Sequence, residues 1–385
     1  MAQAIISRRG GYATITFNGV YALKKIEVVP LKEPQCYLAA TTVGDYALFG
    51  GGAGNGYVSR IDAYNTSLTK TVNRSLSVAR RDLAATTVGN YALFGGGNNG
   101  SYSSTVDAYN TSLIRTIPTA LSVARDNLVA TTVGNYALFG GGYNGSYSST
   151  VDAYNTSLIR TIPTALSVAR DNLAATTVGN YALFGGGYNG SYSSTVDAYN
   201  GSLSRSTPTV LSVARDELAA TTVGNYALFG GGGSSNGRLA TVDAYDSSLT
   251  RTTPTVLSVA RDELAATTVG NYALFGGGNS NGNSSTVDAY DTSLTRTTST
   301  GLIEMRSYLA ATTVGNYALF GGGWGSNGPT KTVDAYYVNN KVLVYPGTKY
   351  KLGSMSSESI SSTMQEIETT APITGYIKIK DATIN

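Results

Sequence analysis

The block YALFGGG occurs seven times in this chain at a nearly constant distance. It starts at Tyr46, Tyr91, Tyr136, Tyr181, Tyr226, Tyr272 and Tyr317, with steps of 45 residues except for one step of 46. A fixed period of this length is typical of solenoids, propellers and other arrays, in which each repeat is one supersecondary unit. The 385 residues are therefore expected to form one large repeat array.

The first half of each repeat predicts a β-hairpin, as the unit beginning at Leu218 illustrates. Residues 218–223 (LAATTV) are small or β-branched, and Gly224-Asn225 is a two-residue hairpin signal. Residues 226–229 (YALF) follow and are apolar on both sides of the pleat. A strand without a polar side is buried on both faces, so this second strand is expected to lie inside a layered β-structure.

The second half of the repeat predicts two further strands. Residues 241–245 (TVDAY) form the third, and residues 249–257 (LTRTTPTVL) form a more polar fourth that includes Pro254. Proline within a strand suits a sheet edge, where the missing N–H is least costly. Because polarity rises from the first strand to the fourth and no helical periodicity occurs, each repeat is expected to be a propeller blade with its fourth strand at the rim.

These motifs resemble the kelch repeat over residues 22–337. The resemblance is carried by FGGG after the second strand, by a tyrosine in the third and by an arginine before the next first strand. The tyrosines are Tyr64, Tyr109, Tyr154, Tyr199, Tyr245, Tyr290 and Tyr336, and the arginines are Arg80, Arg125, Arg170, Arg215, Arg261 and Arg306. The resemblance implies an all-β, seven-bladed β-propeller. Kelch repeats usually place a tryptophan in the fourth strand, whereas the only tryptophan here, Trp324, falls in an expected loop.

The fourth strand of the seventh blade is expected to come from the N-terminus. Lys25 precedes Leu38 by thirteen residues, as Lys70 precedes Leu83 in the next repeat, so residues 22–31 occupy the fourth-strand register. Such pairing of the chain ends removes two free sheet edges. The expected domains are an N-terminal attachment segment (1–21), the propeller (22–337) and a C-terminal β extension (338–385).

Both terminal segments carry strand patterns. Residues 12–17, 341–345 and 376–380 favour strands, and Pro346-Gly347 favours a turn. The extension is interpreted either as a small β appendage or as a contact between copies of the chain.

The composition argues against several function classes. The formal net charge of +3 is too small to indicate a nucleic-acid partner, and the absence of histidine removes the commonest general base and metal ligand. Cys36 is the single cysteine, which excludes an intrachain disulfide and is expected to be a packed thiol. No signal peptide and no apolar run long enough to span a membrane is recognised. We expect no cofactor and no metal.

An aspartate recurs in every third strand, and we interpret it as structural. The seven are Asp62, Asp107, Asp152, Asp197, Asp243, Asp288 and Asp334. A ring of carboxylates could bind cations, but a residue needed once for chemistry is not needed in every blade. We therefore expect each aspartate to pair with backbone or with an arginine between blades, and we expect no enzymatic activity.

Variation is concentrated in the connections between second and third strands, which are expected on one face of the disc. They are rich in Tyr, Asn, Ser and Gly, the composition of adaptable recognition surfaces on a rigid scaffold. The candidate ligand-binding residues are Tyr57, Tyr102, Tyr143, Tyr147, Tyr188, Tyr192, Trp324, Asn99, Asn144 and Asn189. Turn formation alone would account for the Gly, Asn and Ser, but not for the aromatic side chains.

Two function classes follow. Near-identical repeats with short β termini, and the opening MAQAIISRRGG, are similar to bacteriophage structural proteins. This resemblance implies a virion component (tail fibre, baseplate or capsid-attached) that binds a host-surface glycan or protein through the loops and other virion proteins through the termini, with self-association as a further option. A bacterial-surface or cytoplasmic location is the alternative. The second class is a carbohydrate-active enzyme, a glycosidase or lyase, which would require a unique acidic or Tyr/Arg cluster on one face.

Overall fold

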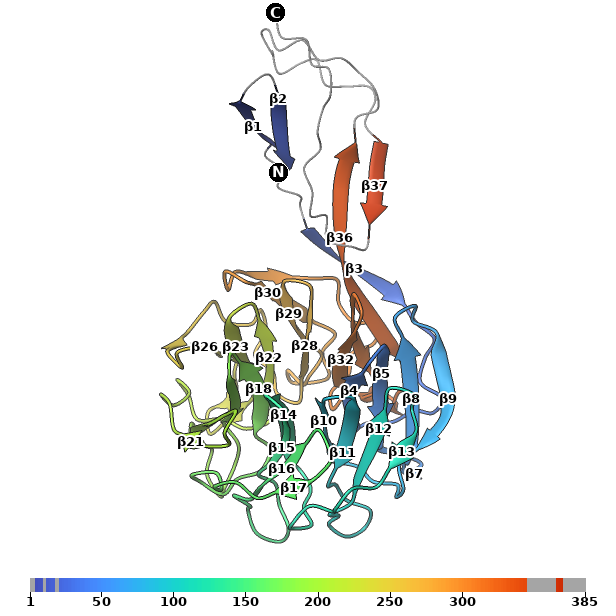
Figure 1. The fold of residues 1–385 in the computed structure, drawn as a ribbon, viewed down its shortest axis with the longest axis vertical. Coiled ribbons are helices and arrows are strands. Elements are labelled where there is room, and N and C mark those ends of the chain that lie inside the picture. Colours follow the sequence, from blue (N-terminus) through green and yellow to red (C-terminus); the bar gives the residue numbers. More distant parts are fainter. Residues whose placement is uncertain (1–3, 10–11, 18–20, 345–364, 370–385) are drawn as a thin grey trace, which may run out of the picture. The chain divides into compact units, whose positions relative to one another are not determined.

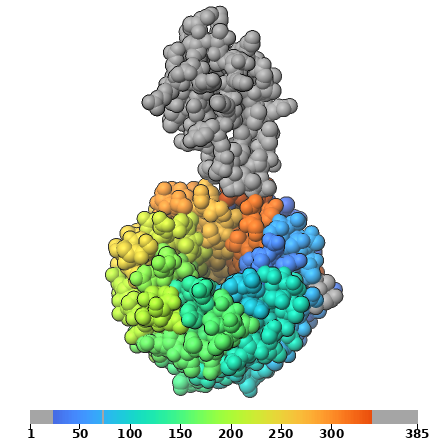
Figure 2. Space-filling model, viewed as in Figure 1, coloured from blue at the N-terminus to red at the C-terminus, as the bar shows by residue number. Residues whose placement is uncertain are grey.

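The computed structural model describes residues 4–9, 12–17, 21–344 and 365–369, and every regular element in these ranges is a β-strand (Figure 1). The chain divides into two units, residues 25–336 and residues 1–24 together with 337–385. The first unit is a seven-bladed β-propeller, whose blades follow one another around the ring in chain order (Figure 2). The expected fold class is therefore confirmed.

Six blades are antiparallel meanders of four strands that are consecutive within the blade. Blade 1 comprises β4 (Ala39–Val43), β5 (Tyr46–Gly50), β8 (Arg60–Asn65) and β9 (Lys70–Ser75); blade 2 comprises β10 (Ala84–Val88), β11 (Tyr91–Gly95), β12 (Val106–Asn110) and β13 (Arg115–Thr116); blade 3 comprises β14 (Val129–Val133), β15 (Tyr136–Gly140), β16 (Val151–Asn155) and β17 (Arg160–Thr161). Blade 4 comprises β18 (Ala174–Val178), β19 (Tyr181–Gly185), β20 (Val196–Asn200) and β21 (Arg205–Ser206); blade 5 comprises β22 (Ala219–Val223), β23 (Tyr226–Gly230), β26 (Val242–Asp246) and β27 (Arg251–Thr252); blade 6 comprises β28 (Ala265–Val269), β29 (Tyr272–Gly276), β30 (Val287–Asp291) and β31 (Arg296–Thr298). Three connections contain small hairpins: β6 (Ala53–Gly54) with β7 (Gly56–Tyr57), β24 (Gly233–Ser234) with β25 (Gly237–Arg238), and β34 (Trp324–Gly325) with β35 (Gly328–Pro329).

The seventh blade is completed by the N-terminal part of the chain, as expected. Its strands are β32 (Ala310–Val314), β33 (Tyr317–Gly321), β36 (Val333–Val344) and β3 (Tyr21–Glu27), and β3 pairs with β36. Lys25 of β3 lies 3.6 Å from the Asp334 carboxylate and donates a hydrogen bond of 2.7 Å to the Gly301 carbonyl. The chain ends of the ring are thus joined by strand pairing and by a partly buried polar contact.

The first strand of every blade lies next to the first strands of both neighbouring blades. Threonine hydroxyls of these strands form a closed ring of seven hydrogen bonds with oxygen–oxygen distances of 2.9 to 3.1 Å. The bonds join Thr41 to Thr87, Thr86 to Thr132, Thr131 to Thr177, Thr176 to Thr222, Thr221 to Thr268, Thr267 to Thr313 and Thr312 to Thr42. The small residues of AATTV therefore line the axis, where the blades are closest.

The second strands form the core between blades. Ala, Leu and Phe of each YALF block are fully buried. Phe139 of blade 3 packs against Gly95 of blade 2, so closely that a Cβ on Gly95 would lie 2.7 Å from the phenylalanine ring. The third-strand Tyr154 packs edge-to-face on Phe139 and donates to the Thr119 carbonyl of the crossover from the preceding blade at 2.7 Å. Each repeat therefore buries its apolar faces against its neighbours.

The fourth strands differ from the prediction because proline ends them early. In blade 5 the strand stops at Thr252, so Pro254 lies beyond it rather than within it. Blades 2 to 5 all carry this proline and have fourth strands of two residues. Blades 1 and 6 lack it and have fourth strands of six and three residues. Proline offers no N–H to a sheet ladder, so pairing ends just before it.

The second unit contains β1 (Ala4–Arg9) paired with β2 (Tyr12–Phe17), and β37 (Gln365–Thr369) paired with residues 340–344 of β36. The strands expected at 12–17 and 341–345 are thus present, the latter up to residue 344. The turn at Pro346-Gly347 and the strand expected at 376–380 lie outside the described residues. Within the described ranges no helix has the length and apolar character needed to cross a membrane.

Candidate functional site

Two sets of residues meet on one face of the propeller, which we call the loop face. The second-to-third connections leave the ends of the second strands. Because first and second strands are antiparallel, these connections lie beside the residues that precede the first strands. Isolated bridges join the two sets in every blade, for example Asp126 with Tyr143 and Asp171 with Tyr188. The loop face consists of these connections and of the residues just before each first strand.

Five of the candidate tyrosines form an unbroken row across blades 2 to 4. Their rings are in edge-to-face contact, with centroid distances of 5.4 to 5.9 Å. The row runs Tyr102, Tyr143, Tyr147, Tyr188, Tyr192. Its end members are 37% and 36% exposed, which leaves aromatic surface open to a ligand. From the sequence these tyrosines were predicted only as individual ligand-binding residues, and the structure brings them together.

A pocket of about 420 Å³ lies at one end of this tyrosine row. Its lining combines the two tyrosines of blade 4 with small apolar and hydroxyl or amide side chains of the next connection. The residues are Tyr188, Gly190, Ser191, Tyr192, Val213, Ala214, Ser234, Ser235 and Asn236. Aromatic surface beside neutral hydrogen-bonding groups is the usual lining of a small-ligand site.

The remaining candidates lie elsewhere or have structural partners. Tyr57 lines a different pocket of about 430 Å³, near the ion pair of Arg60 and Glu33. Trp324 lies in β34, is 45% exposed, and its carbonyl accepts a hydrogen bond from the Asn283 amide.

The three candidate asparagines cap their own turns. Asn99, Asn144 and Asn189 each accept a hydrogen bond from the backbone N–H two residues later, at 3.2 to 3.3 Å. This is the Asx-turn that favours asparagine in loops, so their side-chain oxygens serve the fold of the loop.

A second feature of the loop face is a ring of seven residues around the axis, which we call the mouth ring. Its members stand two positions after the repeat arginine, or after its counterpart in blade 1. They are Tyr37, Asp82, Asn127, Asn172, Glu217, Glu263 and Tyr308. Each backbone N–H donates to the carbonyl of the member in the preceding blade at 3.0 to 3.2 Å, and the bond from Tyr37 to Tyr308 closes the circle.

Every mouth-ring residue has a left-handed backbone conformation, with φ between 48° and 55°. This conformation favours glycine and is uncommon for tyrosine and glutamate. Strained positions that keep non-glycine side chains are enriched at functional sites. The sequence reasoning missed this ring, although an alignment of the repeats shows the signal. One position varies among Tyr, Asp, Asn and Glu, while the leucine after it is invariant and an arginine stands two residues before it in six of the seven repeats.

Acidic groups are concentrated around the mouth. The mouth ring itself supplies three carboxyl groups, and the positions one residue before its members supply four more. The cationic side chains near them are Arg81 and Arg238. The acids are Asp82, Asp126, Asp171, Asp216, Glu217, Asp262 and Glu263. Burial raises the pKa of Asp82, Asp171 and Asp216 to about 6, with further increases from neighbouring aspartates. The mouth is therefore an acidic region of a chain whose overall charge is slightly positive.

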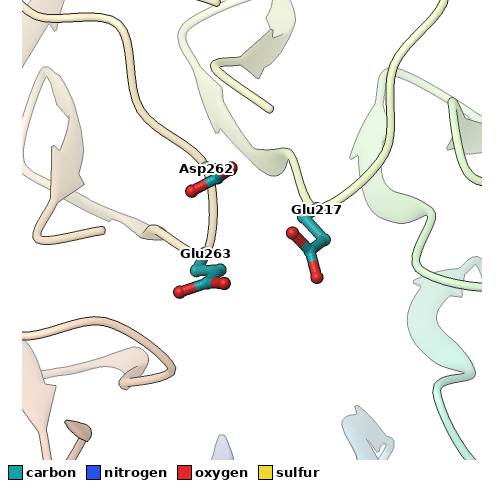
Figure 3. Close-up of side chains that lie close together, drawn as sticks. All are labelled: Glu217, Asp262 and Glu263. Carbon is teal, nitrogen blue, oxygen red and sulfur yellow. The ribbon is translucent and has the colours of Figure 1, made fainter. Parts of the chain in front are cut away.

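The closest cluster of these acids joins blades 5 and 6. Oxygen atoms of Glu217, Asp262 and Glu263 lie within 4.8 Å of one another, and the side chains come from two adjacent segments (Figure 3). Burial, followed by the charges of Asp216, Glu263 and Asp262, raises the pKa of Glu217 to about 8. Glu217 is therefore largely protonated at neutral pH and can donate a hydrogen bond or a proton, while Asp262 is paired with Arg238 at 3.0 Å.

An aromatic pair lies beside this cluster. The Tyr308 hydroxyl donates to Glu263, and burial together with that hydrogen bond raises the pKa of Tyr308. The Tyr37 ring stacks on Tyr308 with a centroid distance of 4.2 Å, and the Arg81 guanidinium lies 5.5 Å from the Tyr37 centroid. At the mouth-ring position tyrosine occurs in two blades only, unlike the scaffold residues that repeat in every blade.

Cys36 is buried next to this aromatic pair. Burial raises the pKa of its thiol to about 11, so the thiol is protonated and is a poor nucleophile.

The recurring aspartates are structural. In six blades the fully buried carboxylate pairs with the fully buried repeat arginine at 2.7 to 2.9 Å. A lysine or arginine of the fourth strand lies 2.9 to 3.8 Å from the same carboxylate in all seven blades. The arginine belongs to the crossover between blades, so each pair anchors a blade to the connection that precedes it.

Comparison with known proteins supports the fold and goes no further. No family model matches the sequence, and no curated protein matches it. Solved structures do match. One of them, YjhT, is 12% identical with a TM-score of 0.52, and the alignment covers 81% of this chain and 97% of that one. At this identity the likeness concerns the propeller fold alone.

Proposed function

We propose that this protein is a non-catalytic recognition module that binds a surface glycan through the loop face. The observation that carries the proposal is the distribution of variation. Scaffold residues repeat almost unchanged in every blade, whereas the mouth ring holds four residue types and the tyrosine row is confined to blades 2 to 4, and both lie on the same face. Tyrosine offers large amphipathic contact area at low entropic cost, and it suits the apolar faces of sugar rings.

The charge of the face defines the class of glycan. Besides the largely protonated Glu217, six carboxyl groups surround the mouth against two guanidinium groups, so an anionic saccharide would approach an unfavourable potential. We therefore propose a neutral or amine-bearing saccharide as the ligand. A protein partner with a basic, sugar-free surface is the alternative for the same face.

We further propose a virion as the setting, with kelch-like blades as the receptor-binding part of a bacteriophage particle. The similarity of the N-terminal sequence to phage structural proteins supports this assignment. In this proposal the β-strands of the terminal unit provide attachment to other virion proteins or to further copies of the chain.

The decisive experiment is a glycan array probed with the purified full-length chain. We expect binding to neutral or glucosamine-containing glycans and not to sialylated or sulfated ones. Preferential binding to sulfated glycans would contradict the charge argument. If the protein binds none of the glycans and does not bind host cells, the proposal of recognition itself is contradicted.

A carbohydrate-active enzyme is the second candidate, and the cluster of Glu217, Glu263 and Tyr308 specifically favours it. Two neighbouring carboxyl groups, one of them with a raised pKa as at Glu217, are the groups that glycosidases use as acid and as base or nucleophile. Incubation of array-positive glycans with the protein, followed by product analysis, distinguishes the two candidates. If products are released and Glu217→Gln abolishes their release, the protein is a carbohydrate-active enzyme. If the glycans stay unchanged, the non-catalytic binding module is supported.

A further inference from the structure

Blade 1 breaks the arginine pattern that the other six blades share. Arg80, Arg125, Arg170, Arg215, Arg261 and Arg306 pair with the third-strand aspartates of blades 2 to 7. The corresponding position in blade 1, 45 residues before Arg80, is Gln35, and the corresponding carboxylate is Asp62. This position lies on the crossover that links the closing strand β3 to blade 1.

The main chain of Gln35 is placed like that of the arginines. Its N–H donates to the Thr330 carbonyl at 3.0 Å, and its carbonyl accepts from Gly323 at 2.8 Å. Arg80 makes the equivalent bonds, to Val58 at 3.1 Å and from Gly52 at 2.8 Å. The glutamine side chain therefore starts from the same point as an arginine side chain would.

Arg80 shows what the guanidinium does at this point. Its nitrogens donate to the carbonyls of Gly96, Phe94 and Val78 at 2.8 to 3.1 Å, and the guanidinium forms an ion pair with the Asp107 carboxylate at 2.9 Å. All of these acceptors are oxygen atoms. In blade 1 the residues that correspond to these acceptors, 45 positions earlier in the sequence, are Gly51, Phe49, Glu33 and Asp62.

Glutamine cannot replace the guanidinium, because its amide ends where the Nε atom of arginine would lie. Gln35 is 0% exposed, and neither its amide oxygen nor its amide nitrogen has a hydrogen-bond partner among the described residues. Asp62 is also 0% exposed. Its Oδ2 accepts from the Lys32 N–H at 3.2 Å, while its Oδ1 lies 3.8 Å from the Lys70 ammonium, beyond hydrogen-bond distance.

A buried amide without hydrogen-bond partners, and a buried carboxylate oxygen that accepts no hydrogen bond, are costly, whereas six equivalent sites pair the corresponding carboxylate with a planar cation. We propose that Gln35 and Asp62 form a site for a small monovalent cation, which we call the seam site, and that guanidinium is its closest chemical fit. The bound ion occupies the position of the absent arginine head group. The cation stabilises the crossover at which the ring closes, so closure of the propeller depends on the ionic medium.

The test uses the full-length protein and three variants in urea unfolding. The wild type is titrated with guanidinium, potassium or sodium chloride up to about 20 mM, against tetramethylammonium chloride at equal ionic strength. Gln35→Arg supplies the missing head group, Arg80→Gln creates a second seam site, and Lys24→Met serves as an exposed control. At ten times its dissociation constant, a single bound ion raises the folding equilibrium constant about elevenfold.

We expect a saturable rise in the urea midpoint of the wild type with guanidinium or an alkali cation, and none with tetramethylammonium. Gln35→Arg should start at a higher midpoint and lose the response, while Arg80→Gln should start lower and respond more strongly. No saturable response in the wild type, or an equal response in Gln35→Arg, would overturn the seam site. If Gln35→Arg does not fold, Arg80→Gln decides, because a response no larger than that of the wild type refutes the proposal.

Discussion

Replacing Glu217 by glutamine should stabilise the protein at alkaline pH and have little effect at acid pH. The ordinary pKa of glutamate, 4.5, is raised to about 8 in the fold, chiefly by burial and then by Asp216, Glu263 and Asp262. Because the folded pKa lies above the unfolded one, the carboxyl favours folding while it is protonated. That contribution is complete below pH 4.5 and is lost as the pH rises through 8.

The magnitude follows from the size of the pKa change. Each step of one in pKa is worth about 1.4 kcal/mol, so the unscreened loss is about 5 kcal/mol. Glu217 is partly exposed and Arg238 is near, so we expect about 1 to 3 kcal/mol after screening.

The assay is urea unfolding of wild type and Glu217→Gln between pH 4.5 and 9. Asp45→Asn is the matched control, since Asp45 is exposed and six repeats carry asparagine at that position. The gain of Glu217→Gln over the wild type should be near zero at pH 4.5, grow between pH 5 and 8, and then level off. A gain that is independent of pH, or a loss at pH 9, would refute the assignment of a strained protonated carboxyl.

Three further predictions concern the scaffold, each measured by urea unfolding. Arg125→Met should lower the free energy of unfolding by about 3 to 5 kcal/mol, because it leaves a fully buried carboxylate without its main partner. Arg160 is partly exposed and contacts the same carboxylate, and Arg160→Met should lower the free energy of unfolding by at most about 1 kcal/mol. Similar losses in the two variants would contradict the structural role of the repeat arginines. Gly141→Ala should cost at least about 1 to 3 kcal/mol, because its φ of +71° is unfavourable for alanine and the new Cβ would lie 2.7 Å from a backbone carbonyl; a neutral effect would refute this geometry. Lys25→Met removes a hydrogen-bond donor of the closing strand and should lower the free energy of unfolding by about 1 to 3 kcal/mol. The neighbouring Lys24 is exposed, and Lys24→Met should have no effect. Equal effects of the two variants would argue against ring closure at this contact.

The period and the alternation within one repeat were sufficient to predict the blades and the closure by residues 22–31. Those features depend on local hydrophobic pattern and on register, both of which are visible in a single sequence. The length of the fourth strands was wrong, because the proline was interpreted as an edge residue within a strand rather than as its end. Blades 1 and 6, which lack it, show the difference in the sequence itself.

The candidate site was only partly accessible from the sequence. The tyrosines were identified as loop residues, but their arrangement in one row depends on the angle between neighbouring blades. The mouth ring was missed because Glu217 and Tyr308 look like linker residues until the ring brings seven such positions around one axis. The exception at Gln35 is visible in the sequence as the one repeat without an arginine. Its consequence is visible only in the structure, where Gln35 is fully buried and its amide has no hydrogen-bond partner among the described residues.

The most direct test of recognition by the loop face is the affinity of the strongest array ligand for matched variants, measured by isothermal titration. Tyr143→Ala with Tyr188→Ala removes the rings on both sides of Tyr147 in the tyrosine row, while Ile159→Ser alters an exposed rim residue whose counterpart in blade 4 is already serine. We predict at least a tenfold loss of affinity for the tyrosine double variant, about 1.4 kcal/mol, and none for the rim variant, with both variants folded in the assay buffer. Equal affinities of the two variants would contradict the account.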